Sequence, residues 1–296
     1  MPGRVAFSQG RSVGRARAGP GGMPEYHGVE SRRYALRLAY DGACFRGFQR
    51  QPGLPTIQEA LEGALGALAI RWIGPLAAAA RTDAGVHALD QVVTFSARAD
   101  LDPEILRREI NARTQDGLAC LDAWRVPRTF HARASALLRT YVYLVGAPAP
   151  DGLRPYAWSL PDERAFPGLA VPHLDPEAVR AALAPAVGEH DFRAFARPGE
   201  SRTTVRTVTR AEVVSASFGP LHAIVIEGRG FLRAMVRNLV GTAVAAGLGL
   251  EPPASLARLL AEGARYRGVR APGRGLTLAR VVYPPGSPLG PRASPP

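Results

Sequence analysis

The sequence predicts an α+β fold, in which a mainly antiparallel sheet is covered by helices on one face. Two observations support this prediction. Segments with the alternation or the β-branched and aromatic content of strands recur along the chain, and amphipathic helical segments lie between some of them. The same theme occurs in both halves of the chain, which predicts two similar α+β halves with a continuous sheet and a central cleft. No clear internal sequence repeat accompanies this similarity.

The first half begins with a strand over 34–40, YALRLAY, whose larger apolar residues alternate with Ala or Arg at period two. Thr56 and Glu59 then form a capping-box pattern, and apolar residues follow at helical spacing up to Leu68. The other elements predicted for this half are an apolar stretch at 76–80, a strand at 91–95, a helix at 103–110, an extended segment at 118–126 and a strand at 140–145.

The second half begins with a helix over 175–187, because Asp-Pro-Glu is typical of a helix start. Strands at 205–214 and 223–227 follow and are joined near Gly219-Pro220. The remaining predicted elements are a long helix at 231–246, a helix at 253–262 and a closing strand at 276–283.

The folded part is predicted to divide into an N-terminal half, residues 31–150, and a C-terminal half, residues 151–284. Residues 1–30 are rich in Gly, Arg and Pro without apolar periodicity. Two interpretations of them are equally good: a disordered basic tail, or a misassigned start codon with Met23 as the true first residue. Residues 285–296 are rich in Pro, Gly and Ser and are predicted to be flexible.

Composition limits the possible functions. The chain has 296 residues and a net charge of +12, which favours a polyanionic partner. All 37 basic residues are arginine, so Schiff-base and phosphate-loop lysines are excluded. Cys44 and Cys120 fit no metal spacing. No apolar run reaches the roughly 18 residues of a membrane span, which predicts a soluble, cytoplasmic protein.

The short segment RTDAGVH, residues 81–87, lies between an apolar stretch and the next predicted strand. Loops at strand ends often carry reactive side chains, and this one offers a cation, a hydroxyl and a carboxylate together. Gly85 permits a sharp bend. Taken alone, the segment is better interpreted as a β-turn in which Asp83 accepts backbone amides.

The segment at 81–87 is accompanied by other motif blocks, which occur in a fixed order along the chain. These are YDGACFRGFQRQ at 40–51, TIQEALE at 56–62, QVV at 91–93, FHARASA at 130–136, RTYVY at 139–143, GEHDF at 188–192, SRTTVR at 201–206, FLRAMVRNLVG at 231–241, AP at 271–272, GLTL at 275–278 and VYP at 282–284. In this order and spacing they resemble the bacterial tRNA pseudouridine synthase A family over residues 34–284.

The resemblance implies a fold, a reaction and its partners. The family has the pseudouridine synthase fold and isomerises uridine to pseudouridine in the anticodon stem-loop of tRNA, without a metal or an organic cofactor. Its members are homodimers whose clefts together hold the tRNA. The matching positions are Asp83 for the catalytic aspartate, Tyr141 for the tyrosine that packs on the target base and Arg237 for the arginine that pairs with the aspartate.

The chemistry agrees with these positions. The reaction breaks a C–N glycosidic bond, turns the uracil and forms a C–C bond to the same sugar carbon. An ionised carboxylate can attack the sugar, attack the base ring or remove a proton from the sugar, and the sequence leaves these three open. A nearby arginine stabilises the charge of such a carboxylate. Because 231–241 is mostly apolar, Arg237 is expected to be buried with a partner, whereas Arg233 could contact phosphate or solvent.

The remaining candidates concern the target base. From the sequence alone, Tyr141, beside Arg139, could stack on an extruded base or pack in the hydrophobic core, and the same holds for Tyr143. The resemblance favours Tyr141 as the tyrosine that packs on the base. A uridine inside a stem must be flipped out to be reached. Arg81 matches the family residue thought to fill the vacated place, and a structural salt bridge is an equally good interpretation.

Other polar residues are assigned structural roles. His87 and His131 are predicted to form hydrogen bonds that order loops, and Asp41, Asp90 and Asp191 are predicted to lie in turns or caps. Departures from the family pattern are Ala80 where glycine is usual, Ala134 where phenylalanine is usual, and the missing Leu-Pro pair after Asn111.

Two other functions compete with the isomerase. A non-catalytic basic RNA-binding protein would explain the charge, but not the match at Asp83, Tyr141 and Arg237. A nuclease or another phosphate-transfer enzyme usually needs clustered carboxylates for metal, and the segment at 81–87 offers only one.

Overall fold

The computed structural model describes residues 30–68, 72–169, 173–196, 203–215 and 220–289. Almost all of the predicted N-terminal tail and residues 290–296 therefore lie outside the described part. The strands that the structure describes form one 10-stranded sheet with the path β4-β1-β3-β10-β5-β9-β8-β7, in which β2 pairs with β3 and β6 pairs with β5. Most pairings are antiparallel, so the predicted α+β fold with a mainly antiparallel sheet is confirmed.

The elements follow the predicted order with several differences at their ends. The strands are β1 (Arg32–Tyr40), β2 (Trp72–Ala78), β3 (His87–Ala97), β4 (Leu118–Val126), β5 (Leu138–Gly146), β6 (Trp158–Ser159), β7 (Gly188–Asp191), β8 (Val205–Ser215), β9 (Leu221–Gly228) and β10 (Leu276–Val282). The helices are α1 (Ile57–Ala67), α2 (Pro103–Asn111), α3 (Pro176–Leu183), α4 (Met235–Gly247) and α5 (Ser255–Glu262). The sequence prediction lacked the short strands β6 and β7, which carry too few residues to show a period.

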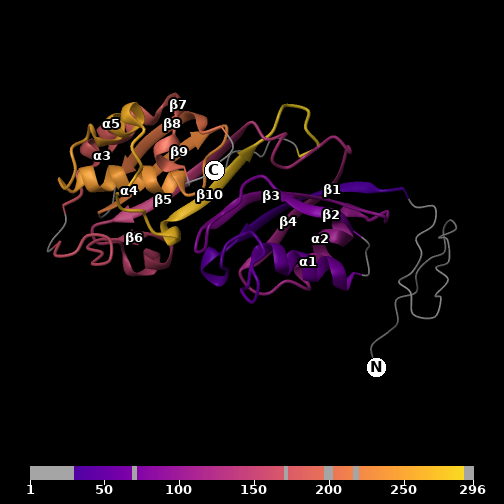
Figure 1. Cartoon of the computed structure of the whole chain (residues 1–296). Coiled ribbons are helices and arrows are strands. Elements are labelled where there is room, and N and C mark those ends of the chain that lie inside the picture. The colour runs from indigo at the N-terminus through magenta and orange to yellow at the C-terminus, as the bar shows by residue number, and fades with distance from the viewer. Residues whose placement is uncertain (1–29, 69–71, 170–172, 197–202, 216–219, 290–296) are drawn as a thin grey trace.

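The last strand, β10, occupies the centre of the sheet. It runs parallel to β3 and antiparallel to β5, and thereby joins β1–β4 to β5–β9 (Figure 1). Helices α1 and α2 lie beside β1–β4, whereas α3, α4 and α5 lie beside β5–β9 (Figure 1). Segments from residues 79–87, 138–146 and 271–282 therefore meet where these two groups of strands join.

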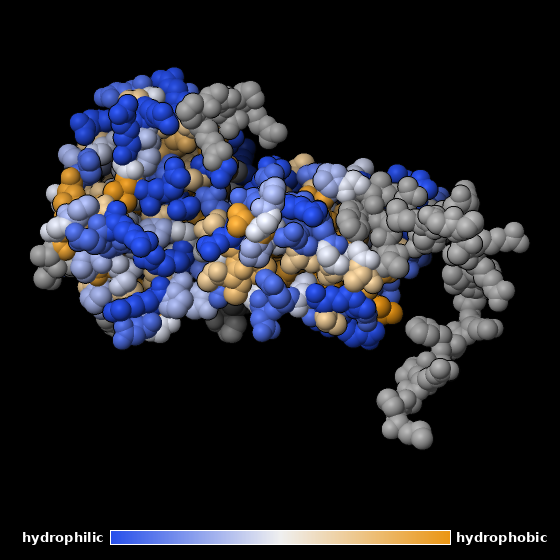
Figure 2. Space-filling view, turned by 60° about the horizontal axis from the view of Figure 1, so that its bottom comes forward, coloured by the Kyte–Doolittle hydropathy of each residue, from blue (hydrophilic) through white to orange (hydrophobic). Residues whose placement is uncertain are grey.

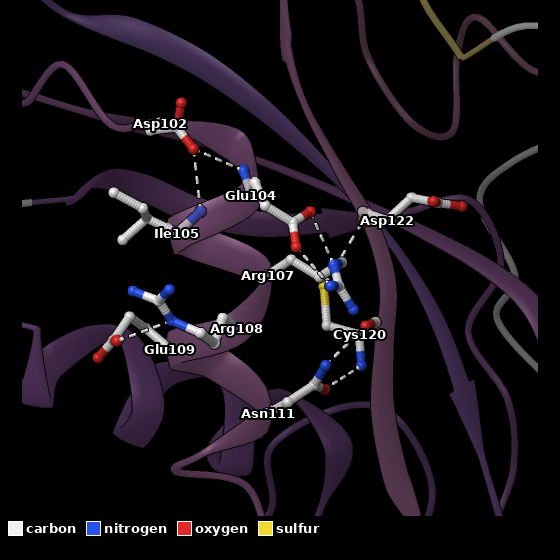
Figure 3. A network of polar contacts seen from close by, with 9 residues as sticks. All are labelled: Asp102, Glu104, Ile105, Arg107, Arg108, Glu109, Asn111, Cys120 and Asp122. Carbon is white, nitrogen blue, oxygen red and sulfur yellow. Dashed lines mark hydrogen bonds and ion pairs between the residues drawn. The ribbon is translucent and has the colours of Figure 1, made fainter.

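Helix α2 shows how local sequence anchors a helix to the sheet. Asp102 caps its N-terminus by accepting hydrogen bonds from the backbone amides of Glu104, at 2.9 Å, and Ile105, at 3.0 Å (Figure 3). At the other end, the Asn111 side chain donates to the carbonyl of Cys120 at 2.9 Å and accepts from its amide at 2.7 Å. These two bonds fix α2 against β4. The predicted cap of α1 is also present, since the Thr56 side chain accepts from the amide of Glu59.

Strand β1 carries a buried arginine, Arg37. Arg37 lies 3.0 Å from Asp90 and 3.3 Å from Asp122, and it donates to the carbonyl of Leu289. Asp90 was predicted to be a turn or cap residue, and this is wrong. It lies inside β3, where its carboxylate pairs with Arg37 and accepts from the amide of Val281 at 2.9 Å. Leu289, within the predicted C-terminal tail, is buried here.

Helix α4 starts later than its apolar pattern predicts. The pattern begins at Phe231, but the helix begins at Met235 because Ala234 adopts the left-handed conformation with φ of 57°. Alanine is disfavoured there, since its Cβ approaches the following carbonyl oxygen. The bend at Ala234 separates Arg233 from the helix that carries Arg237. No helix in the described ranges is long and apolar enough to cross a membrane.

Replacing Ala234 by glycine is expected to stabilise the protein by roughly 0.5–1 kcal/mol, because glycine has no Cβ to strain. The free energy of unfolding in urea measures this change. The matched control is Ala257→Gly, on an exposed position inside α5, where glycine should destabilise by a similar amount. If both variants lose the same stability, Ala234 is not strained.

Candidate active site

The segment at 81–87 is part of a loop between β2 and β3, held by a small polar network. The Gln91 side chain donates to the Ala80 carbonyl at 2.7 Å and accepts from the Ala80 amide at 3.3 Å. It also donates to the Tyr40 hydroxyl, which lies 2.8 Å from the Thr82 hydroxyl. Both backbone groups of Ala80, the position where the family usually has glycine, are thus engaged, and the loop is anchored on both sides of Arg81.

Close backbone contacts complete the fixation of the loop. Gly85 has φ of +76°, as a sharp bend at a glycine requires. On the other side, a Cβ at Gly273 would lie 2.3 Å from the Ala84 carbonyl oxygen, so the loop packs directly on the backbone that precedes β10. The Phe48 amide donates to the Thr82 carbonyl at 3.0 Å. The path of the backbone around Asp83 is therefore set by three separate segments.

Asp83 meets two arginines, Arg237 in the first turn of α4 and Arg233 just before that helix. Its Oδ2 atom accepts a hydrogen bond from Nη1 of Arg237 at 3.0 Å, and its Oδ1 atom lies 3.7 Å from Nε of Arg233. The Asp83 and Arg237 side chains are 21% and 17% exposed, whereas that of Arg233 is 61% exposed. A carboxylate held in this way has a counter-ion at one oxygen and remains partly open to a substrate.

Arg237 is itself fixed by the backbone. Its Nε atom donates to the Ala271 carbonyl at 2.7 Å, and the Ala271 amide donates to the Arg237 carbonyl at 3.1 Å. Because a guanidinium presents its donors in a rigid fork, the bond to Ala271 orients Nη1 toward Asp83. The expected pairing of Arg237 with a partner is present, whereas its side chain is half-buried and not fully buried as expected.

Tyr141 lies on β5 and its ring contacts Phe231 edge-on, with 5.5 Å between the ring centres. Burial raises the pKa of the Tyr141 phenol well above its usual range, and the nearby Tyr40 and Asp83 act in the same direction. The phenol therefore keeps its proton at neutral pH. Such a side chain is suited to packing and hydrogen bonding rather than to removing a proton.

Arg81 is exposed, and no described carboxylate pairs with it. Tyr143, the other tyrosine of β5, is fully buried and donates to the Pro272 carbonyl at 3.0 Å, so it serves the core. Arg139, which stands beside Tyr141 in the sequence pattern, is also buried and bonds to backbone carbonyls.

The two histidines order loops, as expected. Nδ1 of His87 accepts from the Gly42 amide at 3.1 Å, so Nε2 carries the proton and donates to the Arg274 carbonyl. With Nδ1 acting as an acceptor, its 3.1 Å approach to the Asp41 carboxylate is a contact and not a hydrogen bond. Nδ1 of His131 accepts from the amides of Arg133 and Ala134.

Two of the predicted capping aspartates are also confirmed. The Asp41 side chain accepts from the Ala43 amide, and that of Asp191 accepts from the Arg193 amide. Neither carboxylate takes part in the Asp83 cluster.

The family assignment follows from sequence comparison. Residues 182–284 match the family model described as tRNA pseudouridine synthase. The tRNA pseudouridine synthase A of Frankia casuarinae is 41% identical over 88% of this chain and 93% of its own length. The chain belongs to the tRNA pseudouridine synthase A family. Its relatives in Thermosipho africanus and Bordetella petrii are 36% and 39% identical over 85% and 86% of this chain, and cover 100% and 92% of their own lengths.

Membership of the family confirms the resemblance derived from the motif blocks. The family model covers α4 and β10, which carry Arg237 and the backbone that holds it. Sequence reasoning missed Tyr40 and Gln91, which fix the loop, and the carbonyl of Ala271, which fixes Arg237. Gln91 had a signal that could have been used, since it is a polar residue inside an apolar strand pattern. A backbone carbonyl has no such signal.

Proposed function

We propose that this protein isomerises uridine to pseudouridine in tRNA, with Asp83 as the catalytic carboxylate. The observation that carries the proposal is the hydrogen-bonded pair of Asp83 and Arg237, 154 positions apart in the sequence, beside the buried phenol of Tyr141. A carboxylate that is partly exposed and has a fixed counter-ion is suited to covalent or proton-transfer chemistry at an electron-poor carbon.

The reaction needs no second substrate. The bond from uracil N1 to the sugar breaks, the bond from C5 to the same sugar carbon forms, and the proton lost from C5 is balanced by a proton gained at N1. Asp83 acts on the sugar or the base ring, while Arg237 holds it in place. Tyr141 packs on the base, and Arg81, which is exposed beside Asp83, fills the place that the flipped nucleotide leaves in the stem. No metal or organic cofactor enters this scheme.

The substrate region we propose is the anticodon stem-loop, with a homodimer as the acting species in the cytoplasm. The net charge of +12 supports a polyanionic partner. Strongly hydrophilic residues are spread over both halves on the face shown in Figure 2, with smaller apolar groups between them. Arg81 and Arg233 lie at the exposed edge of the Asp83 site, where phosphates of a bound stem would pass.

The alternative is a basic RNA-binding protein without catalysis. It would need the charge but not a carboxylate at the centre of a basic surface, because a carboxylate repels phosphate. The pairing of Asp83 with Arg237 therefore favours the enzyme.

Mapping pseudouridines in cellular tRNA, with and without the gene for this chain, tests the proposed function. We expect anticodon-arm pseudouridines to disappear from the strain without the gene and to return when the gene is restored. The purified protein should also form pseudouridine in an unmodified tRNA transcript. An unchanged anticodon arm together with an inactive purified protein would contradict the proposal.

A further inference from the structure

Arg139 on β5 is an arginine whose surroundings are unusual. It is 6% exposed, and burial lowers the pKa of its guanidinium. Its five side-chain hydrogen bonds in the described structure all go to main-chain carbonyl oxygens, and no described carboxylate pairs with it. Burying a cation without a carboxylate partner costs free energy of desolvation. The hydrogen bonds that Arg139 makes must therefore offset that cost.

The five hydrogen bonds use the full donor set of the guanidinium. Nε and Nη2 donate to the Ala79 carbonyl at 3.3 and 3.1 Å, and Nη2 also donates to the Arg133 carbonyl at 2.6 Å. Nη1 donates to the carbonyls of Ala136 at 3.1 Å and Arg229 at 2.6 Å. One side chain thus bridges three separate segments of the backbone to β5.

Two of the bridged segments lead directly to the Asp83 site. Ala79 lies four residues before Asp83 in the same loop, and Arg229 lies four residues before Arg233 at the approach to α4. Arg139 itself stands two residues before Tyr141, and both side chains point to the buried face of β5. Its bonds therefore set the distance between the carboxylate, the strand that carries the tyrosine and the segment that leads to the paired arginine.

We propose that Arg139 is a positioning residue for the isomerisation, which fixes the catalytic loop and the approach to α4 against the strand of Tyr141. The inference rests on the proposed function. Arg139 does not touch the substrate, because it is buried behind the loop. Its effect is on the rate of the chemical step, where a displacement of about 1 Å in a reacting group lowers the rate about 100-fold.

Lysine at this position separates the roles of charge and of geometry. A lysine ammonium keeps the charge but has three donors in place of five, so at least two of the carbonyl bonds must be lost. In tRNA single-turnover assays well below the melting temperature, Arg139→Lys is expected to lower the rate about 10- to 100-fold. The dissociation constant for tRNA should stay within about twofold of the original, because the side chain is buried.

The matched control is Arg37→Lys. Arg37 is 7% exposed, as buried as Arg139, but its partners are Asp90, Asp122 and the Leu289 carbonyl, which lie outside the catalytic loop. The Arg37→Lys substitution should lower the melting temperature of the protein and leave the single-turnover rate near that of the original protein. If Arg139→Lys also melts earlier but turns over at the original rate, Arg139 is only structural and the proposal is overturned.

A second variant applies if Arg139→Lys does not fold. Arg139→Ala, refolded with millimolar ethylguanidinium as a free side-chain mimic, is expected to regain activity that saturates with the mimic. Restored folding without restored turnover would overturn the proposal. Failure of the proposed function would look different, because the unsubstituted protein itself would then form no pseudouridine.

Discussion

Replacing Asp83 by asparagine is expected to abolish pseudouridine formation, with kcat lowered by roughly 10⁴-fold or more. The amide keeps the size of the carboxylate but has neither its negative charge nor its nucleophilic oxygen pair. It can still accept the hydrogen bond from Arg237, so the loop should keep its place. Tritium release from tRNA labelled at uracil C5 measures the turnover, because the C5 hydrogen leaves during isomerisation.

Asp191→Asn is the matched control for this experiment. Asp191 caps a turn through the Arg193 amide, and asparagine is as good a cap as aspartate. This control should retain its activity. The affinity of Asp83→Asn for tRNA should be unchanged or higher, because a negative charge next to phosphates has been removed. Turnover retained by Asp83→Asn would show that another group performs the chemistry.

Much of the fold could be predicted because its elements have local signals. The strand at 34–40 alternates with period two, and the capping residues of α1 and α2 stand at fixed offsets from their helices. The pairing partners of β10 have no local signal. A strand at the end of the chain can reach any place in the sheet, and only tertiary packing selects its position between β3 and β5.

The candidate site also combines features that the sequence predicts with features that have no local signal. Asp83 and Arg237 are far apart in the sequence, and composition alone would have left Asp83 as a turn residue, so the family resemblance was needed to pair them. The left-handed Ala234 was not predictable, since alanine normally favours a helix and the apolar pattern continues through it. The contacts of Arg139 could not be predicted, because its partners are backbone carbonyls, which every residue has.

Replacing Arg237 by methionine is expected to lower kcat about 100- to 1000-fold, the usual effect of removing one preorganised charged donor from an active site. Methionine has a similar length and suits the apolar helix, so much of the packing is kept. The Asp83 carboxylate would lose the hydrogen bond at 3.0 Å, and the Ala271 carbonyl would lose its bond at 2.7 Å. Steady-state kinetics with a tRNA transcript measure both kcat and KM.

Arg233→Met separates the paired arginine from its neighbour. Arg233 is 61% exposed and lies 3.7 Å from the carboxylate, and exposed ion pairs contribute about 0–1 kcal/mol. Removing the Arg233 guanidinium should change kcat by less than about 5-fold. It should raise KM, because the main partner of Arg233 in the complex with tRNA is the phosphate backbone. The kcat of Arg237→Lys should lie between those of Arg237→Met and Arg233→Met. The lysine ammonium keeps the charge but cannot hold Asp83 and the Ala271 carbonyl in one rigid fork. If Arg233→Met lowers kcat more than Arg237→Met does, then Arg233 is the functional partner of Asp83 in the complex with tRNA, and the start of α4 must move when tRNA binds.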